Sequence, residues 1–133
     1  MILVCVTEQK SSRRLIEAGR RLADKADVPL KVICVRSCEH KNWLASEEVE
    51  ILFDISKHLS AEMIVKFSNQ AAEAVSAYVD SQPVQVILVG TPPKSEPSPF
   101  IQELESSHPD IPLIQVDLSG KLKQPLTSKR DNR

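Results

Sequence analysis

Short runs of apolar, mostly β-branched residues recur along this chain, and they constrain its fold more than any other feature. Residues 2–6 read ILVCV, and residues 30–35 read LKVICV. Runs that are apolar at nearly every position are typical of strands covered on both faces, as in a parallel sheet. Further strands are predicted at residues 62–67, 85–89 and 111–118.

Between these runs the apolar residues return at helical spacing. Residues 11–26 and 44–59 each predict an amphipathic helix, the second with Glu48 as the single polar residue on its inner side. Regular alternation of strands and helices predicts right-handed βαβ crossovers. We therefore expect an α/β fold: a single doubly wound, Rossmann-like sheet of five parallel strands with helices on both faces.

The starts of the last two helices carry local signals. The third helix follows Ser68 or Asn69, either of which can cap its first amides. The fourth is predicted to begin at Ser98-Pro99, because serine caps a helix and proline suits the first helical position.

The length and composition allow one domain. A chain of 133 residues with 41% hydrophobic content can bury a core but is too short for two ordinary domains. We predict an α/β domain over residues 1–119 and a basic, disordered tail over residues 120–133, because the tail has no periodic apolar face.

Charge and hydropathy exclude several classes of protein. The net charge of −1 argues against a nucleic-acid binder. No apolar run reaches the roughly 20 residues that span a bilayer, and the apolar start lacks the basic residues of a signal peptide. Three cysteines, two of them in apolar runs, fit a reducing compartment, so we expect a cytoplasmic protein without membrane insertion.

Several stretches resemble the universal stress protein family, and more closely the stress-protein-like domain of KdpD-type potassium sensor histidine kinases. They are "ILVCVT", "SSRRLIEAGRRLADKADVPLKVICVR", "AEMIVKFSNQAAEAVSAYVDSQPVQVILVGTP" and "HPDIPLIQVDL". The resemblance implies the strand order 3-2-1-4-5, a homodimer through the edge strand at residues 111–118, and a sensor kinase or another protein as the regulated partner.

The resemblance also implies where a nucleotide would bind. In nucleotide-binding members an acidic residue follows the first strand, the second strand offers backbone groups, and a glycine-rich loop after the fourth strand holds the phosphates. Thr7 stands where the acid would be, Val35 fits the adenine side, and Gly90 fits the first glycine of the loop.

The residues after Gly90 depart from that pattern. A phosphate cradle needs several backbone N–H groups and the conformational freedom of glycine. Proline has no N–H, and the chain holds only three glycines. This favours a non-catalytic regulatory or ligand-sensing domain without the usual glycine loop and without a bound cofactor. The prolines of this stretch are Pro92, Pro93, Pro97 and Pro99.

Two alternatives stay open. In one, side chains replace the backbone amides and hold the phosphates of ATP, AMP or a cyclic dinucleotide, as arginine forks do. In the other, the domain is a pure protein-interaction module. The side chains of the first alternative are Lys10, Ser11, Ser12, Arg13, Thr91, Lys94 and Ser98.

Metal binding and catalysis find little support in the sequence. Cys34, Cys38 and His40 have suggestive spacing, but Cys34 lies in an apolar strand and no second ligand pair follows. Neither a G-x-S-x-G elbow nor an H-E-x-x-H motif is present. We therefore expect neither a metal site nor an enzyme.

Overall fold

The structure is a computed structural model that describes residues 1–6, 12–39, 47–90, 98–117 and 122–123, and strands alternate with helices along it. The strands are β1 (Ile2–Val6), β2 (Leu30–Arg36), β3 (Glu62–Phe67), β4 (Val86–Gly90), β5 (Leu113–Val116) and β6 (Leu122–Lys123), and the helices are α1 (Ser12–Ala26), α2 (Glu47–His58), α3 (Ala71–Ser81) and α4 (Pro99–Ser107).

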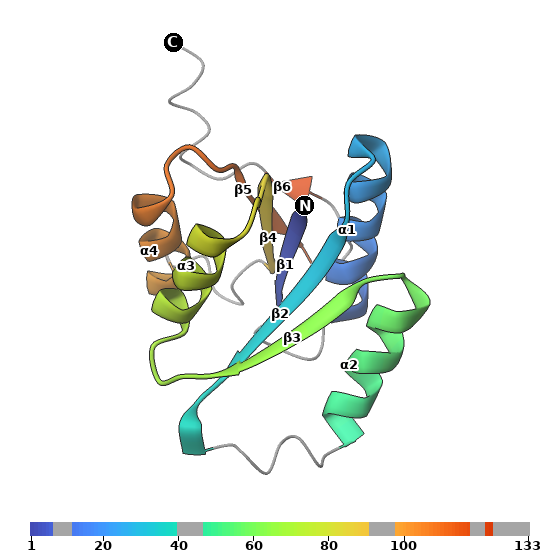
Figure 1. The fold of residues 1–133 in the computed structure, drawn as a ribbon, viewed down its shortest axis with the longest axis horizontal. Helices are drawn as coiled ribbons and strands as arrows, with labels where there is room; N and C mark the ends of the chain where they lie inside the picture. The colour runs from blue at the N-terminus through green and yellow to red at the C-terminus, as the bar shows by residue number, and fades with distance from the viewer. Residues whose placement is uncertain (7–11, 40–46, 91–97, 118–121, 124–133) are drawn as a thin grey trace.

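The strands form one sheet in the order β3-β2-β1-β4-β5-β6 (Figure 1). The first five are parallel, with β1 paired to β2 on one side and to β4 on the other. The predicted α/β class and the order 3-2-1-4-5 are confirmed. Because the chain leaves β1 in one direction and later returns to its other side, the strand order reverses between β1 and β4.

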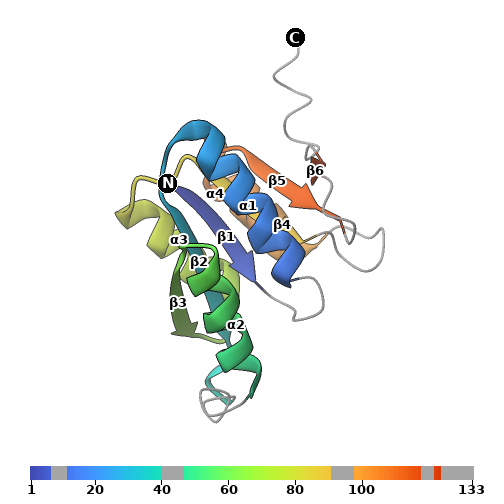
Figure 2. The ribbon, with the colours of Figure 1, turned by 90° about the vertical axis from the view of Figure 1, so that its right-hand side faces the viewer.

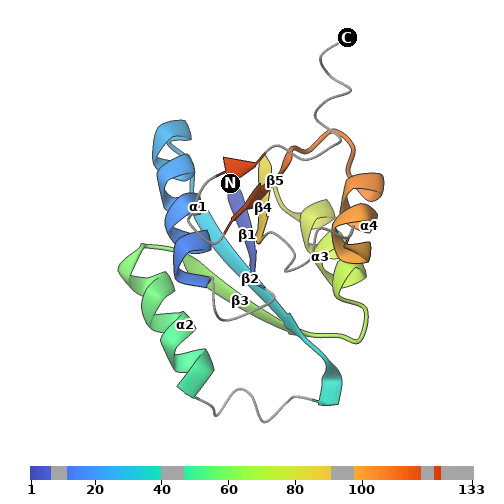
Figure 3. The same cartoon turned by 180° about the vertical axis from the view of Figure 1, so that it is seen from behind.

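The helices cover both faces of the sheet. Alternate residues of β1 point to opposite faces: Val4 packs in the cluster that contains residues of α1 and α2, and Leu3 packs in the cluster that contains residues of α3 and α4. Figures 2 and 3 show α1 and α2 together on one face. None of the described helices is long and apolar enough to cross a membrane.

The end of the sheet at β5 differs from the expectation. β6 pairs with β5 in antiparallel fashion, Gln115 opposite Lys123 and Val116 opposite Leu122. The prediction that residues 111–118 form the edge strand is therefore wrong. The five parallel strands are as predicted, and β6 is an additional antiparallel strand. A strand of two residues within a polar segment has no periodicity that sequence reasoning could detect. The rest of the predicted tail, apart from β6, lies outside the described residues.

The predicted helix starts had different outcomes. Ser98 caps α4 as predicted: its Oγ accepts a hydrogen bond from the Ile101 N–H at 3.3 Å, and Pro99 takes the first helical position. The prediction for α3 is wrong, because its N-cap is Gln70, which makes no side-chain capping bond. Ser68 Oγ instead accepts from the Gln70 N–H at 3.0 Å, before the helix begins.

Candidate functional site

The crevice expected in such a sheet lies at the carboxyl ends of β1 and β4, where the strand order reverses. Cys5 is opposite Val89, so the two strands end side by side at Val6 and Gly90. The segments that follow them, residues 7–11 and 91–97, lie outside the described residues. The same is true of five predicted site residues: Thr7, Lys10, Ser11, Thr91 and Lys94.

Val35 lies at the end of β2 nearest this crevice. Ile2 N donates to Pro29 O at 2.9 Å, and Ser68 N donates to Arg36 O at 2.8 Å. Because the backbone groups of successive strand residues point to alternate sides, those of Val35 point toward β1. Val35 is one residue beyond the position paired with Val6, the last residue of β1. Its carbonyl is therefore directed at the crevice edge.

Helix α1 brings a positive charge to the same edge. Ser12, whose side chain is not described, begins the helix, and Arg13 and Arg14 are exposed in its first turn, which holds no acidic residue. The Arg13 side chain is 66% exposed, and its guanidinium lies 4.0 Å from Glu17. The positive end of the helix dipole adds to these charges. An anion at this edge would meet a positive electrostatic potential.

Ser98 lies on the far side of the crevice, at the start of α4. Its oxygen is already engaged as the acceptor of the helix cap. A serine hydroxyl that accepts one hydrogen bond can still donate another. Ser98 can therefore both cap α4 and contribute its O–H to a ligand.

Arg36 is a residue of this edge that sequence reasoning missed. Its Nη2 donates to Glu48 Oε1 at 2.7 Å, and the two side chains are only 16% and 26% exposed. The pair joins the end of β2 to the first turn of α2. Glu48 is the polar break already noted on the inner side of that helix, and the signal that could have revealed the pair is the need of such an acid for a cation.

A second contact ties the ends of β2 and β3 together. Cys38 N donates to Asn69 Oδ1 at 3.0 Å. Asn69 therefore stabilises the turn after β2, and it does not cap α3. This hydrogen bond joins the turn after β2 to the turn before α3 at the carboxyl edge of the sheet.

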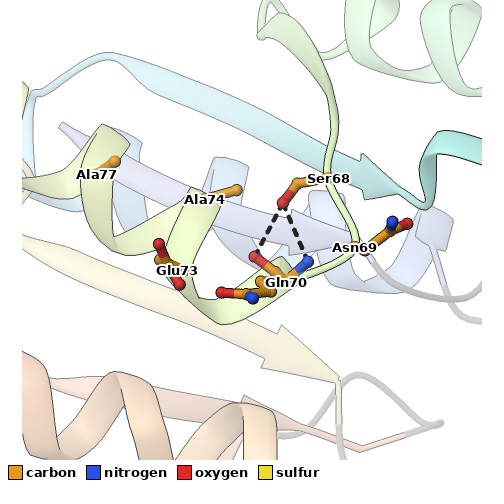
Figure 4. Close-up of a pocket in the computed structure, with 6 residues that line it drawn as sticks. All are labelled: Ser68, Asn69, Gln70, Glu73, Ala74 and Ala77. Carbon is orange, nitrogen blue, oxygen red and sulfur yellow. Dashed lines mark hydrogen bonds between the residues drawn. The ribbon is translucent and has the colours of Figure 1, made fainter.

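A surface hollow of about 420 Å³ lies beside this contact (Figure 4). Figure 4 shows that its walls come from the start of α3 and the residues just before it. It contains none of the predicted site residues, because it adjoins the end of β3 and not the reversal between β1 and β4. Its lining residues are Ser68, Asn69, Gln70, Glu73, Ala74 and Ala77.

The cysteines do not form a reactive centre. All three are free; Cys5 and Cys34 are buried, and Cys38 is exposed. Burial raises the pKa of the Cys5 thiol to about 12 and also raises the pKa of Cys34. Cys34 lies in the core as predicted, and His40 lies outside the described residues. Among the described side chains, no group of three or more His, Cys, Asp or Glu could hold a metal ion.

Solved structures identify this architecture. The chain aligns with a universal stress protein from Archaeoglobus fulgidus with a TM-score of 0.64 and 16% identity, over 86% of this chain and 96% of that one. The fold is that of the universal stress proteins. The chain also aligns with the universal stress protein from Archaeoglobus fulgidus in complex with dAMP. The TM-score is 0.61 and the identity 17%, over 86% of this chain and 94% of that one.

A protein of the universal stress protein family from Burkholderia pseudomallei shares the fold, with a TM-score of 0.59 and 15% identity over 86% of this chain and 94% of that one. No protein-family model matches the sequence of this chain. No curated protein matches it either. The likeness to universal stress proteins is therefore one of fold.

Proposed function

We propose that this chain is a non-catalytic, ligand-sensing domain of the universal stress protein type, and that it binds an adenine nucleotide between β1 and β4. The observation that carries the proposal is the reversal of strand order at β1, flanked by the carbonyl of Val35 on one side and the end of β4 on the other. Ligands of open α/β sheets bind at this place.

The proposed ligand is a nucleoside monophosphate rather than a triphosphate. The prolines after Gly90 lack the backbone N–H groups that a triphosphate cradle needs. A single phosphate needs only one anion site. The exposed Arg13 and Arg14 can supply charged donors for it. The dAMP complex of a protein with the same fold supports this choice of ligand.

The adenine would lie toward β2. An exocyclic amino group donates hydrogen bonds, and the Val35 carbonyl, directed at the crevice edge, is an acceptor. The phosphate would lie toward the start of α1, and the Ser98 hydroxyl would donate from the start of α4. ATP carries two more phosphates than AMP, and because the prolines after Gly90 lack backbone N–H donors, ATP is expected to bind more weakly.

The cysteine side chains of the domain agree with a sensing role that involves no catalysis. The two buried thiols have a raised pKa and are protonated at neutral pH, so neither is a nucleophile. Regulation of a partner, whether a KdpD-type sensor kinase or another protein, is proposed from the sequence resemblance. Nucleotide binding would be the signal passed to that partner.

A thermal-shift screen with calorimetry tests the proposal. The ligands are AMP, dAMP, ADP, ATP, cyclic di-AMP and inorganic phosphate. AMP or dAMP at a hundredfold its Kd should stabilise the fold by about 2.7 kcal/mol. Binding should fall in Arg13→Ala and Lys94→Ala and persist in Lys25→Ala, which removes a positive charge from the other end of α1. Absence of binding by every nucleotide would contradict the proposal and favour the pure interaction module.

A further inference from the structure

Strand β3 forms the end of the sheet opposite β6, and among the described residues no strand pairs with its outer side (Figures 1 and 2). Its apolar residues Met63, Ile64 and Val65 are only partly buried, whereas every residue of β1 is buried. An open apolar edge is a template for pairing with another chain. We propose that two copies of this chain associate through antiparallel pairing of β3, centred on Ile64.

The backbone of β3 permits this register. Ser68 N donates to Arg36 O, so the backbone groups of Ser68 and of alternate residues before it point toward β2. Those of Met63 and Val65 therefore point outward. A two-fold axis at Ile64 sets Met63 of one copy opposite Val65 of the other, and such a pair exchanges two backbone hydrogen bonds.

The charges of β3 select the same register. With Ile64 on the axis, Glu62 lies opposite Lys66 of the second copy, and the pair occurs twice. A lysine on an edge strand ordinarily discourages pairing, but here the strand carries the complementary acid four residues before it. An axis at Lys66 would oppose two lysines. Glu62 and Lys66 are both exposed, and Glu62 also accepts from Lys31 Nζ at 3.1 Å within its own chain.

Helix α2 adds an apolar side chain near the junction. Phe53 is 46% exposed. Glu48 faces β2, where it contacts Arg36, and five residues at 100° each place Phe53 on the opposite flank of the helix. That flank faces the β3 side of the sheet, on the face where Met63 packs. The interface thus combines strand pairing, two charge pairs and an aromatic side chain from each copy.

Charge exchange between the two copies tests the interface. The full chain should show concentration-dependent dimers by light scattering. In Glu62→Lys alone or Lys66→Glu alone, like charges face each other, and self-association should weaken about tenfold. An equimolar mixture of the two variants opposes unlike charges in both pairs, so it should recover the dimer. Lys25→Glu and Glu103→Lys, exposed residues on α1 and α4, are the matched controls and should leave the dimer unchanged.

A cross-link locates the interface independently of the charge variants. Ile64→Cys in a Cys38→Ser background places two thiols opposite each other on the axis, and mild oxidation should give a covalent dimer. Ile114→Cys on β5, in the same background, should not. A protein that is monomeric at every concentration would overturn the proposal. A dimer whose affinity is unchanged in both charge variants, and that does not cross-link at residue 64, would overturn it as well.

Discussion

Gly19 lies where α1 crosses the sheet. A Cβ atom there would lie 2.6 Å from Val4 Cγ2 and 2.9 Å from Leu30 Cδ1, both on buried side chains. Gly19→Ala should lower the free energy of unfolding by about 1–2 kcal/mol, since overpacking costs about 1–3 kcal/mol and helix propensity returns at most about 1 kcal/mol. Urea denaturation measures the change.

A double-mutant cycle provides the control for Gly19. Val4→Ala removes the closer of the two contacts, so Gly19→Ala should cost less in that background than alone. A Gly19→Ala protein as stable as the unchanged chain would show that α1 does not approach the sheet this closely.

The thiols differ in their expected reactivity. Cys38 is exposed, while Cys5 and Cys34 are buried with raised pKa values. In the native protein one thiol should react rapidly with a disulfide reagent, and three should react in denaturant. Raising the pH to 9 should not make Cys5 reactive, because burial raises the pKa of its thiol to about 12. Rapid native reaction of a second thiol, or of any thiol in Cys38→Ser, would contradict the burial.

At the scale of elements, the start of α4 depends on one side chain. Ser98→Ala should lower the free energy of unfolding by about 1 kcal/mol, because it removes the acceptor for the Ile101 N–H. Ser98→Asp should keep the cap. Chemical denaturation compares these with Ser106→Ala, an exposed serine in the same helix. Equal stability of the two alanine variants would contradict the capping role.

The sequence predicted elements whose signals are local. β1 is apolar throughout and β2 is apolar at five of its seven positions, so both gave clear strand signals, and Ser98-Pro99 marked a helix start correctly. The start of α3 could not be predicted, because Asn69 is held by Cys38, thirty-one residues away in the chain. The contact of Arg36 with Glu48 likewise joins different elements. The predicted site residues that can be located lie around one edge of the sheet: Ser12, Arg13, Val35, Gly90 and Ser98.

At the scale of the whole molecule, the two ends of the sheet and its carboxyl edge have different roles. β6 covers β5 at one end, while β3 is open at the other. Parallel pairing brings the ends of β1, β2 and β4 together, although they come from distant parts of the sequence. The proposed nucleotide site and the proposed dimer interface therefore lie on separate surfaces and can be tested separately.

A titration of the isotope-labelled protein with AMP, followed by amide NMR spectra, tests the central claim most directly. The account predicts saturable shifts for the amides of Val35, Arg36 and Gly90 and for the first turn of α1, with little change at Ser68 to Gln70. No shifts at millimolar AMP, or shifts confined to the hollow at the start of α3, would contradict a nucleotide site between β1 and β4.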